Sequence, residues 1–250
     1  MRLIAIALCL SAVLCTVYAP IPNYSKDNLE GPRLEIRIAI RNVESTIQRV
    51  ERVHADTKGD TVVTVIRRLW EQMDSHRDYV DLLLESMRRE VNNAKFRGVD
   101  AEHCYDTNRE AIIEHTDVAN KAATTCQENA EKSIENSLGF LESFISVGNN
   151  LIEELNDLIR DCHSDDTMKE ESCVLIEYAK VNADVKQFEE DVKHIEHSAL
   201  PVSNYVVRTA TDCLTDSYSL ARFESEGAMS SNSRCVEDAV DKEKRYNLVA

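Results

Sequence analysis

The chain has few of the residues that build turns and sheets, since its 250 residues include only 6 glycines and 4 prolines. No stretch of any length alternates polar and apolar residues as a half-buried strand would. Beyond Leu14, no run approaches the roughly 18 apolar residues that a membrane-spanning helix needs. These absences predict an all-α protein without stable membrane insertion.

The sequence also lacks the common catalytic and cofactor motifs. It contains no Gly-rich phosphate loop, no GxSxG elbow and no HExxH zinc motif. Adjacent carboxylates are present, but neighbours on a helix point about 100° apart and therefore form solvated faces rather than acid/base pairs. These runs are Glu153-Glu154, Glu170-Glu171 and Glu189-Glu190-Asp191. We expect a non-enzymatic protein that needs no cofactor.

Charge divides the chain into two parts. Residues 26–97 carry 14 Lys and Arg against 13 Asp and Glu, whereas residues 98–250 carry 14 against 32. The resulting formal net charge of −16 repels phosphate backbones and anionic membranes. We therefore expect no nucleic-acid partner, and we interpret the acidity first as the solvated surface of an exported protein.

The first residues have the pattern of a secretory signal peptide. Arg2 precedes an apolar run from Leu3 to Leu14, and Val17 and Ala19 follow at the spacing of a cleavage site. We assign residues 1–19 to the signal and predict a secreted, extracellular protein. A leader at residues 20–31 contains an N-glycosylation sequon at Asn23, which predicts a glycoprotein.

A helical seam over residues 100–162 organises the rest of the chain. Its second half places apolar or small residues at alternating steps of four and three, as a packed helix requires: Ile134, Leu138, Leu141, Ile145, Gly148, Ile152, Leu155, Ile159 and Cys162. One unbroken helix here would span about 90 Å. We therefore predict an elongated antiparallel helical bundle, monomeric or homodimeric, with this helix as its spine.

Further helices flank the spine. Residues 32–98 indicate two helices that part at Lys58-Gly59 and form an N-terminal antiparallel pair. A return helix begins near residues 170–173, and its apolar stripe keeps phase past Pro201 through Thr209, Cys213 and Leu220. We interpret the proline as a kink in one helix or a tight break in line with it. Gly227 and a Ser-rich run at 230–233 should end this helix, leaving residues 241–250 as a C-terminal tail.

Of eight cysteines, Cys9 and Cys15 lie in the signal, and six remain. Six cysteines in an exported chain predict three disulfides, for which fifteen pairings exist. In an antiparallel helical hairpin, residues lying opposite one another have a constant sum of residue numbers. Cys104 with Cys235 and Cys126 with Cys213 both sum to 339, and Cys162 with Cys173 sums to 335.

The rival local pairing would join Cys104 to Cys126 and Cys213 to Cys235. Within one helix, two cysteines 22 residues apart are separated by about 33 Å, whereas a disulfide holds its Cα atoms ~4.4–6.8 Å apart. No helix-breaking residue lies midway, near His115. We therefore predict the nested pairs and a disulfide-clamped acidic hairpin domain over residues 99–240.

The same residues resemble a known family. A helical, acidic region with Cys104-Tyr105, Asn108, Cys126, Asp161-Cys162, Cys173, Cys213 and Cys235 is similar to the tsetse EP protein domain family of insect secreted proteins. The resemblance covers roughly residues 100–240. It implies an exported gut or body-fluid protein, related in some members to immune challenge, with no shared catalytic residues. This chain has no Glu-Pro repeat, so no role of that repeat is carried over.

Histidines supply the remaining candidates for chemistry. His194 and His197 stand one helical turn apart, near Glu190 and Glu196, and could offer two metal ligands, but zinc requires four. We expect them to be exposed polar residues and assign no metal site. His54 and His76 fall on apolar stripes and should be interhelical. His103 beside Cys104 suggests an activated thiol, although a partnered cysteine in an oxidising compartment is expected to be bridged.

Two functions remain. The first is an extracellular interaction protein, gut or body-fluid and defence related, whose acidic surface engages another protein or a microbial surface. The second is a carrier whose helices part around an apolar small molecule or lipid. Because the seam residues already pack against each other, we favour the first.

Overall fold

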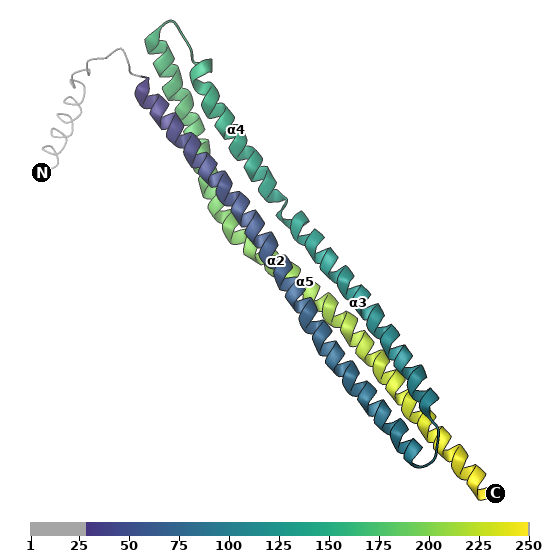
Figure 1. Ribbon diagram of the computed structural model, residues 1–250. Coiled ribbons are helices and arrows are strands. Elements are labelled where there is room, and N and C mark those ends of the chain that lie inside the picture. Colours follow the sequence, from purple (N-terminus) through teal and green to yellow (C-terminus); the bar gives the residue numbers. More distant parts are fainter. Residues whose placement is uncertain (1–28, 250) are drawn as a thin grey trace, which may run out of the picture. The chain divides into compact units, whose positions relative to one another are not determined.

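The computed structural model describes residues 29–249 and is all-α within them (Figure 1). Four helices follow one another: α2 (Glu30–Phe96), α3 (Glu102–Leu138), α4 (Phe140–Asp161) and α5 (Thr167–Val249). The predicted signal peptide and the sequon at Asn23 lie outside the described residues. In the part of the chain that the structure describes, no helix has a stretch long and apolar enough to cross a membrane.

The chain forms two compact units. Unit 1 contains residues up to 45 together with 148–188, and unit 2 contains residues 46–147 together with 189–250. The helices α2, α4 and α5 therefore contribute to both units. The predicted domain boundary near residue 98 is wrong, because helices that are distant in sequence pair along their lengths.

In unit 2, α2 and α5 run parallel, and α3 runs antiparallel to both. Contacts from α2 to α5 join residues that are 142 apart, as in Thr61–Ser203, or 147 apart, as in Tyr79–Glu226. The antiparallel direction of α3 follows from Lys58 meeting Glu135 while Arg88 meets Glu102. Between these three helices the buried side chains form separate clusters along the unit.

The buried face of each helix follows the heptad-like spacing of its sequence. Two clusters in unit 2 illustrate the packing, one around Leu69, Ala123 and Leu214 and the other around Met87, Ile112 and Val236. In unit 1 the buried side chains are mainly large and aliphatic: Ile36, Val43, Leu151, Leu155, Leu158, Val174, Val181, Val185 and Phe188.

The predicted N-terminal helical pair is wrong, since α2 is one helix through Lys58 and Gly59. A single glycine in a helix costs only about 1 kcal/mol relative to alanine. Against that cost, the buried face continues in phase through Val50, Thr61 and Val65. The Thr61 hydroxyl also donates to the carbonyl of Thr57 at 2.6 Å across the glycine.

The predicted spine is interrupted at one residue. α3 ends at Leu138 and α4 begins at Phe140. Between them, the Gly139 N–H donates to the carbonyl of Asn136 at 3.3 Å, which is the tighter i to i−3 bonding of a 3₁₀ turn. The residues on both sides of this turn are helical, as predicted.

α5 passes through Pro201 as one helix, as predicted, but it also continues past Gly227 to Val249. In the serine-rich run, the Ser231 hydroxyl donates to the carbonyl of Gly227 at 3.0 Å, and the Asn232 and Ser233 side chains donate to Glu90 of α2, each at 3.0 Å. These contacts with α2 hold the run in the bundle. The predicted C-terminal tail at 241–250 is therefore helical as far as residue 249.

The predicted apolar stripe of α5 is wrong beyond Val206. Thr209, Cys213 and Leu220 are exposed, and the buried positions are Ala210, Leu214, Tyr218 and Ala221. From Val206 to Tyr218 the buried residues are spaced four apart, instead of alternately four and three apart. The longer spacing compensates for the drift of a helix with 3.6 residues per turn against a repeat of 3.5.

Candidate functional site

The three disulfides join the pairs that the residue-number sums predict. Cys104–Cys235 and Cys126–Cys213 connect α3 to α5 in unit 2, with Cα atoms 5.7 and 5.9 Å apart. Cys162–Cys173 connects the end of α4 to the start of α5 in unit 1, with Cα atoms 5.5 Å apart. These distances lie inside the range that a disulfide allows.

The turn between α2 and α3 positions the first of these bridges. Gly98 adopts φ +82°, a left-handed conformation that ends α2 at low cost because glycine has no Cβ. The Asp100 carboxylate then accepts the backbone N–H of Glu102 at 3.1 Å. Cys104 consequently lies in the first turn of α3, at the positive end of the helix dipole.

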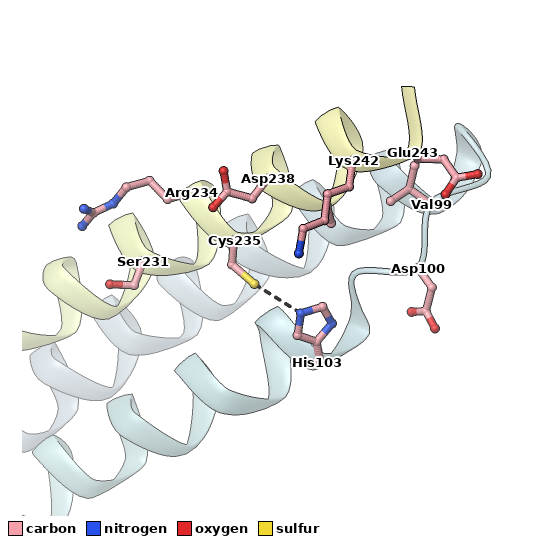
Figure 2. A pocket seen from close by; sticks show the side chains of 10 residues that line it. Val99, Asp100, His103, Ser231, Arg234, Cys235, Asp238, Lys242 and Glu243 are labelled. Carbon is pink, nitrogen blue, oxygen red and sulfur yellow. Dashed lines mark hydrogen bonds between the residues drawn. The ribbon is translucent and has the colours of Figure 1, made fainter. Parts of the chain in front are cut away.

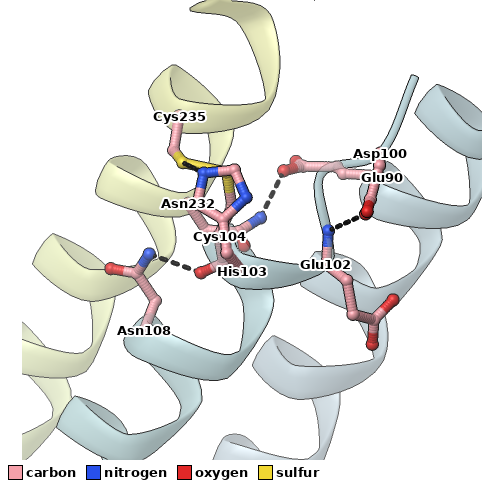
Figure 3. The surroundings of a disulfide bond; sticks show 8 residues. All are labelled: Glu90, Asp100, Glu102, His103, Cys104, Asn108, Asn232 and Cys235. Atoms are coloured by element: carbon pink, nitrogen blue, oxygen red, sulfur yellow. Dashed lines mark hydrogen bonds between the residues drawn. A yellow bond between two sulfur atoms is a disulfide. The ribbon is translucent and has the colours of Figure 1, made fainter. Parts of the chain in front are cut away.

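Side-chain contacts hold this first turn in place. The guanidinium of Arg88 pairs with the Glu102 carboxylate and stacks over the ring of Tyr105, 3.5 Å from its centroid. The Asn108 amide donates to the carbonyl of Cys104 at 2.7 Å (Figure 3). The backbone around the disulfide is therefore anchored to both α2 and α3.

A groove of about 830 Å³ lies beside Cys235. It is lined by charges of both signs: Arg234 and Lys242 are basic, and Asp100, Asp238 and Glu243 are acidic. Figure 2 shows His103 facing the Cys235 sulfur from α3, while the Arg234 side chain extends away from that sulfur.

His103 is the one sequence candidate that the structure places at a reactive bond. Its Nε2 lies 3.5 Å from the sulfur of Cys104 and 3.5 Å from that of Cys235 (Figure 3). Cys104 is only 1% exposed, whereas Cys235 is half-buried and lines the groove. The sequence showed His103 next to Cys104, but its contact with Cys235 depends on the packing of α5.

The same three residues are the group that could hold a metal ion in the described part of the chain. Their ligand atoms all lie within 4.8 Å of one another. Zinc binds thiolates and imidazoles, but here the two sulfurs are bonded to each other, so the set is a disulfide beside an imidazole. His194 and His197, the two histidines considered as ligands, are exposed and belong to no such group among the described residues.

The other two bridges have different surroundings. The groove at Cys162–Cys173 is about 660 Å³ and is lined by five carboxylates: Glu153, Glu154, Asp157, Asp161 and Glu177. The smaller groove at Cys126–Cys213, about 280 Å³, has no charged residue among those that line it. The Ser217 hydroxyl lies 3.9 Å from the Cys126 sulfur.

A second polar cluster lies in the interior of unit 2 around His76, which is 1% exposed. The Thr116 hydroxyl donates to the carbonyl of Ile112 at 2.9 Å, so it accepts a hydrogen bond from His76 Nε2 at 3.2 Å. The other ring nitrogen of His76 has no partner. Burial, and next the nearby Arg222 guanidinium, lower the pKa of His76.

Tyr218 belongs to this interior cluster, and the half-buried Tyr79 lies near its edge, where Arg222 stacks over the Tyr79 ring at 5.5 Å. Tyr218 is 1% exposed, lies against the His76 ring at 5.2 Å between centroids, and donates to Asn120 at 2.9 Å. Burial raises the pKa of Tyr218. Tyr79 donates to Glu226 at 2.7 Å, and burial together with this hydrogen bond raises the pKa of Tyr79 to about 12. The cluster joins all three helices of unit 2.

The remaining candidates occupy different parts of the chain. His54 is half-buried on α2, as an interhelical histidine would be, and Glu190 is exposed. Glu153 and Glu154 are also exposed and line the groove at Cys162–Cys173. Glu196 forms an ion pair with Arg49 at 2.9 Å.

Neither a family model, nor a curated protein, nor a solved structure matches this chain. The resemblance to the tsetse EP protein domain family remains a prediction from cysteine spacing. Functional inference therefore depends on the geometry of the chain itself.

Proposed function

We propose that this protein is a secreted, non-catalytic helical interaction protein whose acidic helices engage a basic surface of an extracellular protein or a microbe. The observation that carries the proposal is the distribution of charge among the helices. α2 carries 12 Lys and Arg against 12 Asp and Glu, whereas α3, α4 and α5 carry 3 against 8, 1 against 5 and 10 against 16. Acidic helices beside a neutral one give the bundle distinct faces for recognition.

The packing supports an interaction protein over a carrier of an apolar molecule or lipid. Seam residues such as Ile134, Leu141 and Leu155 are fully buried against neighbouring helices. The grooves at Cys104–Cys235 and Cys162–Cys173 are lined largely by charged side chains, and an apolar ligand would lose more by desolvating those charges than it gains.

The non-catalytic part of the proposal is supported by the placement of the titratable groups. His76 is buried away from these grooves, and its hydrogen-bonded partner is a threonine that already donates to a backbone carbonyl. A general base must lie within hydrogen-bonding reach of the substrate proton that it removes, and the buried His76 lines neither groove.

Binding to an immobilised oligoarginine peptide tests the proposed acidic face. Changing the five carboxylates of the Cys162–Cys173 groove to amides should weaken binding about tenfold at low salt, because each removes an attraction that salt screens. The matched control changes five exposed carboxylates of α2 to amides: Glu44, Glu51, Asp56, Asp78 and Asp81. It carries the same change in net charge and should leave binding nearly unaltered.

Equal losses in both variants would show a response to net charge alone and contradict a distinct acidic face. Native mass spectrometry distinguishes the proposed interaction protein from the alternative, a carrier of an apolar small molecule or lipid. A lipid that co-purifies in stoichiometric amount would support a carrier and overturn the proposal.

A further inference from the structure

The three disulfides differ in the groups that surround their sulfurs, and this difference bears on their reactivity. Cys104–Cys235 has an imidazole nitrogen 3.5 Å from each sulfur. The groove at Cys126–Cys213 is lined by uncharged residues. The groove at Cys162–Cys173 is lined by five carboxylates, of which Asp157 and Asp161 pair with Arg160, and Glu177 with Lys180. Because thiol–disulfide exchange passes through thiolates, a nearby donor accelerates it and nearby carboxylates slow it.

From this geometry we propose that Cys104–Cys235 is a thiol–disulfide exchange site for a small peptide thiol that carries both amino and carboxylate groups, of which glutathione is the probe. The proposal is independent of the proposed interaction function. It concerns the chemistry of one bond and the groove beside it.

Cys104 has the features of a good leaving group. It lies in the first turn of α3, where the helix dipole stabilises a negative charge. His103 Nε2, when it carries the proton, can donate to the departing sulfur across the 3.5 Å that separates them. Cys104 is 1% exposed, so its sulfur is shielded from direct attack. The Cys104 sulfur is therefore the leaving group and not the attacked atom.

Cys235 has the features of the attacked sulfur. It is half-buried and lines the groove of about 830 Å³. Arg234 and Lys242 in this groove can hold the carboxylates of a peptide thiol, and Asp238 and Glu243 can hold its ammonium group. Figure 2 shows Asp238 and Lys242 following Cys235 along α5, while the Arg234 side chain extends away from the Cys235 sulfur.

The reaction requires two equivalents of the thiol. The first thiolate attacks the Cys235 sulfur and forms a mixed disulfide there, while the Cys104–Cys235 bond breaks and its electron pair leaves on the Cys104 sulfur beside His103. The second thiolate attacks the sulfur of the bound peptide, forms the oxidised dimer of the peptide thiol, and releases Cys235 as a thiolate that takes a proton from water. The two thiols supply both electrons that reduce the bridge.

Site-resolved reduction tests the proposal. The folded, oxidised protein is incubated with glutathione, quenched with an alkylating reagent at intervals, and digested so that the rate at each bridge is obtained by peptide mapping. Cys104–Cys235 should react about tenfold faster than either other bridge. Equal rates at the three bridges, or fastest reaction at Cys162–Cys173, would overturn the proposal.

Two substitutions of His103 separate chemistry from structure. The side chain is exposed, so His103→Ala should retain the helical circular dichroism of the parent protein. It should slow reduction of Cys104–Cys235 about tenfold and leave the other bridges unchanged, while His103→Lys, which restores an N–H donor, should recover most of the rate. An unchanged rate in His103→Ala would contradict the role of the imidazole.

A matched control addresses the second bridge. Ser217→Ala removes the hydroxyl near Cys126 and should leave the rate at Cys104–Cys235 unaltered.

A double variant tests the groove. Arg234→Ala with Lys242→Ala should slow the reduction of Cys104–Cys235 by glutathione but not its reduction by 2-mercaptoethanol, which carries no carboxylate. If both reagents slow equally, the groove does not bind the peptide thiol and that part of the proposal is wrong.

Discussion

Unit 1 buries large aliphatic side chains between its helices, whereas unit 2 buries many alanines together with five polar residues: Thr46, Thr61, His76, Ser225 and Asn232. The covalent links differ as well. Unit 1 has one bridge between residues 11 apart, and unit 2 has two that join residues 131 and 87 apart. Unit 1 therefore holds its helices in register mainly through aliphatic packing, and unit 2 does so with the help of polar contacts and long-range disulfides.

The physical reason lies in the size of the seam residues. Apolar burial contributes about 25 cal/mol per Å², so a seam of alanines such as Ala119, Ala123 and Ala210 contributes less than one of leucines. Specific hydrogen bonds, as between Thr61 and Ser203 at 2.7 Å, define the register in unit 2. Long-range disulfides then lower the entropy of the unfolded chain.

Removing bridges should produce the largest difference between the units. Replacing Cys126 and Cys213 together by alanine should lower the free energy of unfolding by up to about 4 kcal/mol, and replacing Cys162 and Cys173 by about 2–3 kcal/mol, because the first closes the longer loop. Denaturant unfolding of the two variants measures both values. A larger loss from the Cys162–Cys173 variant would contradict the assignment of unit 2 as the part that depends on its bridges.

A cavity in the aliphatic seam should have an effect of similar size. Leu155→Ala removes a side chain of unit 1 that is 0% exposed and should cost about 2–5 kcal/mol. The control, Ile176→Ala, changes a side chain that is 58% exposed in the same unit and should cost less than about 0.5 kcal/mol. Similar losses in the two variants would mean that Leu155 does not belong to a packed core.

The disulfide pairing and the helical class were predictable because both depend on regular geometry. A constant sum of residue numbers is a long-range constraint that Cys104, Cys126, Cys213 and Cys235 satisfy together. The helix ends were less predictable, because each depends on a small local cost. Gly59 is tolerated inside α2, since the buried seam on either side outweighs the penalty of about 1 kcal/mol.

The candidate site was predictable only in part. The sequence places His103 beside Cys104, but whether the ring approaches Cys235 depends on side-chain rotation and on the exact phase of α5. That phase departs from the predicted stripe after Val206. Contacts between helices such as Tyr79–Glu226 likewise depend on a register that no local pattern specifies.

A smaller effect is expected from a single hydrogen bond in the polar seam. Tyr218→Phe removes the hydroxyl that donates to Asn120 at 2.9 Å and should lower the free energy of unfolding by about 0.5–1.5 kcal/mol. Tyr205→Phe is the matched control, since Tyr205 is 69% exposed. If thermal unfolding shows the same midpoint for Tyr218→Phe and for the parent, the hydrogen bond does not stabilise unit 2.

The smallest expected effect is a pH dependence that belongs to unit 2. Burial and Arg222 lower the pKa of His76 from its ordinary value of 6.5, so the unfolded chain binds a proton at this position more readily than the folded one. Stability from His76 is then complete above pH 6.5 and is lost as the pH falls from 6.5 toward the lower folded pKa. The direction follows from the structure, because the proton would enter at the ring nitrogen that has no acceptor.

Chemical denaturation at intervals between about pH 7.5 and about pH 5 measures this loss. His76→Gln keeps an amide N–H that can donate to Thr116 but cannot take up a proton, so its stability should fall less steeply with decreasing pH than that of the parent. Leu200→Gln is the control, since Leu200 is 65% exposed and has no titratable group, and its slope should follow the parent. Identical slopes in His76→Gln and the parent would show that the acid sensitivity arises elsewhere, and the polar seam of unit 2 would then stabilise the fold without making it responsive to pH.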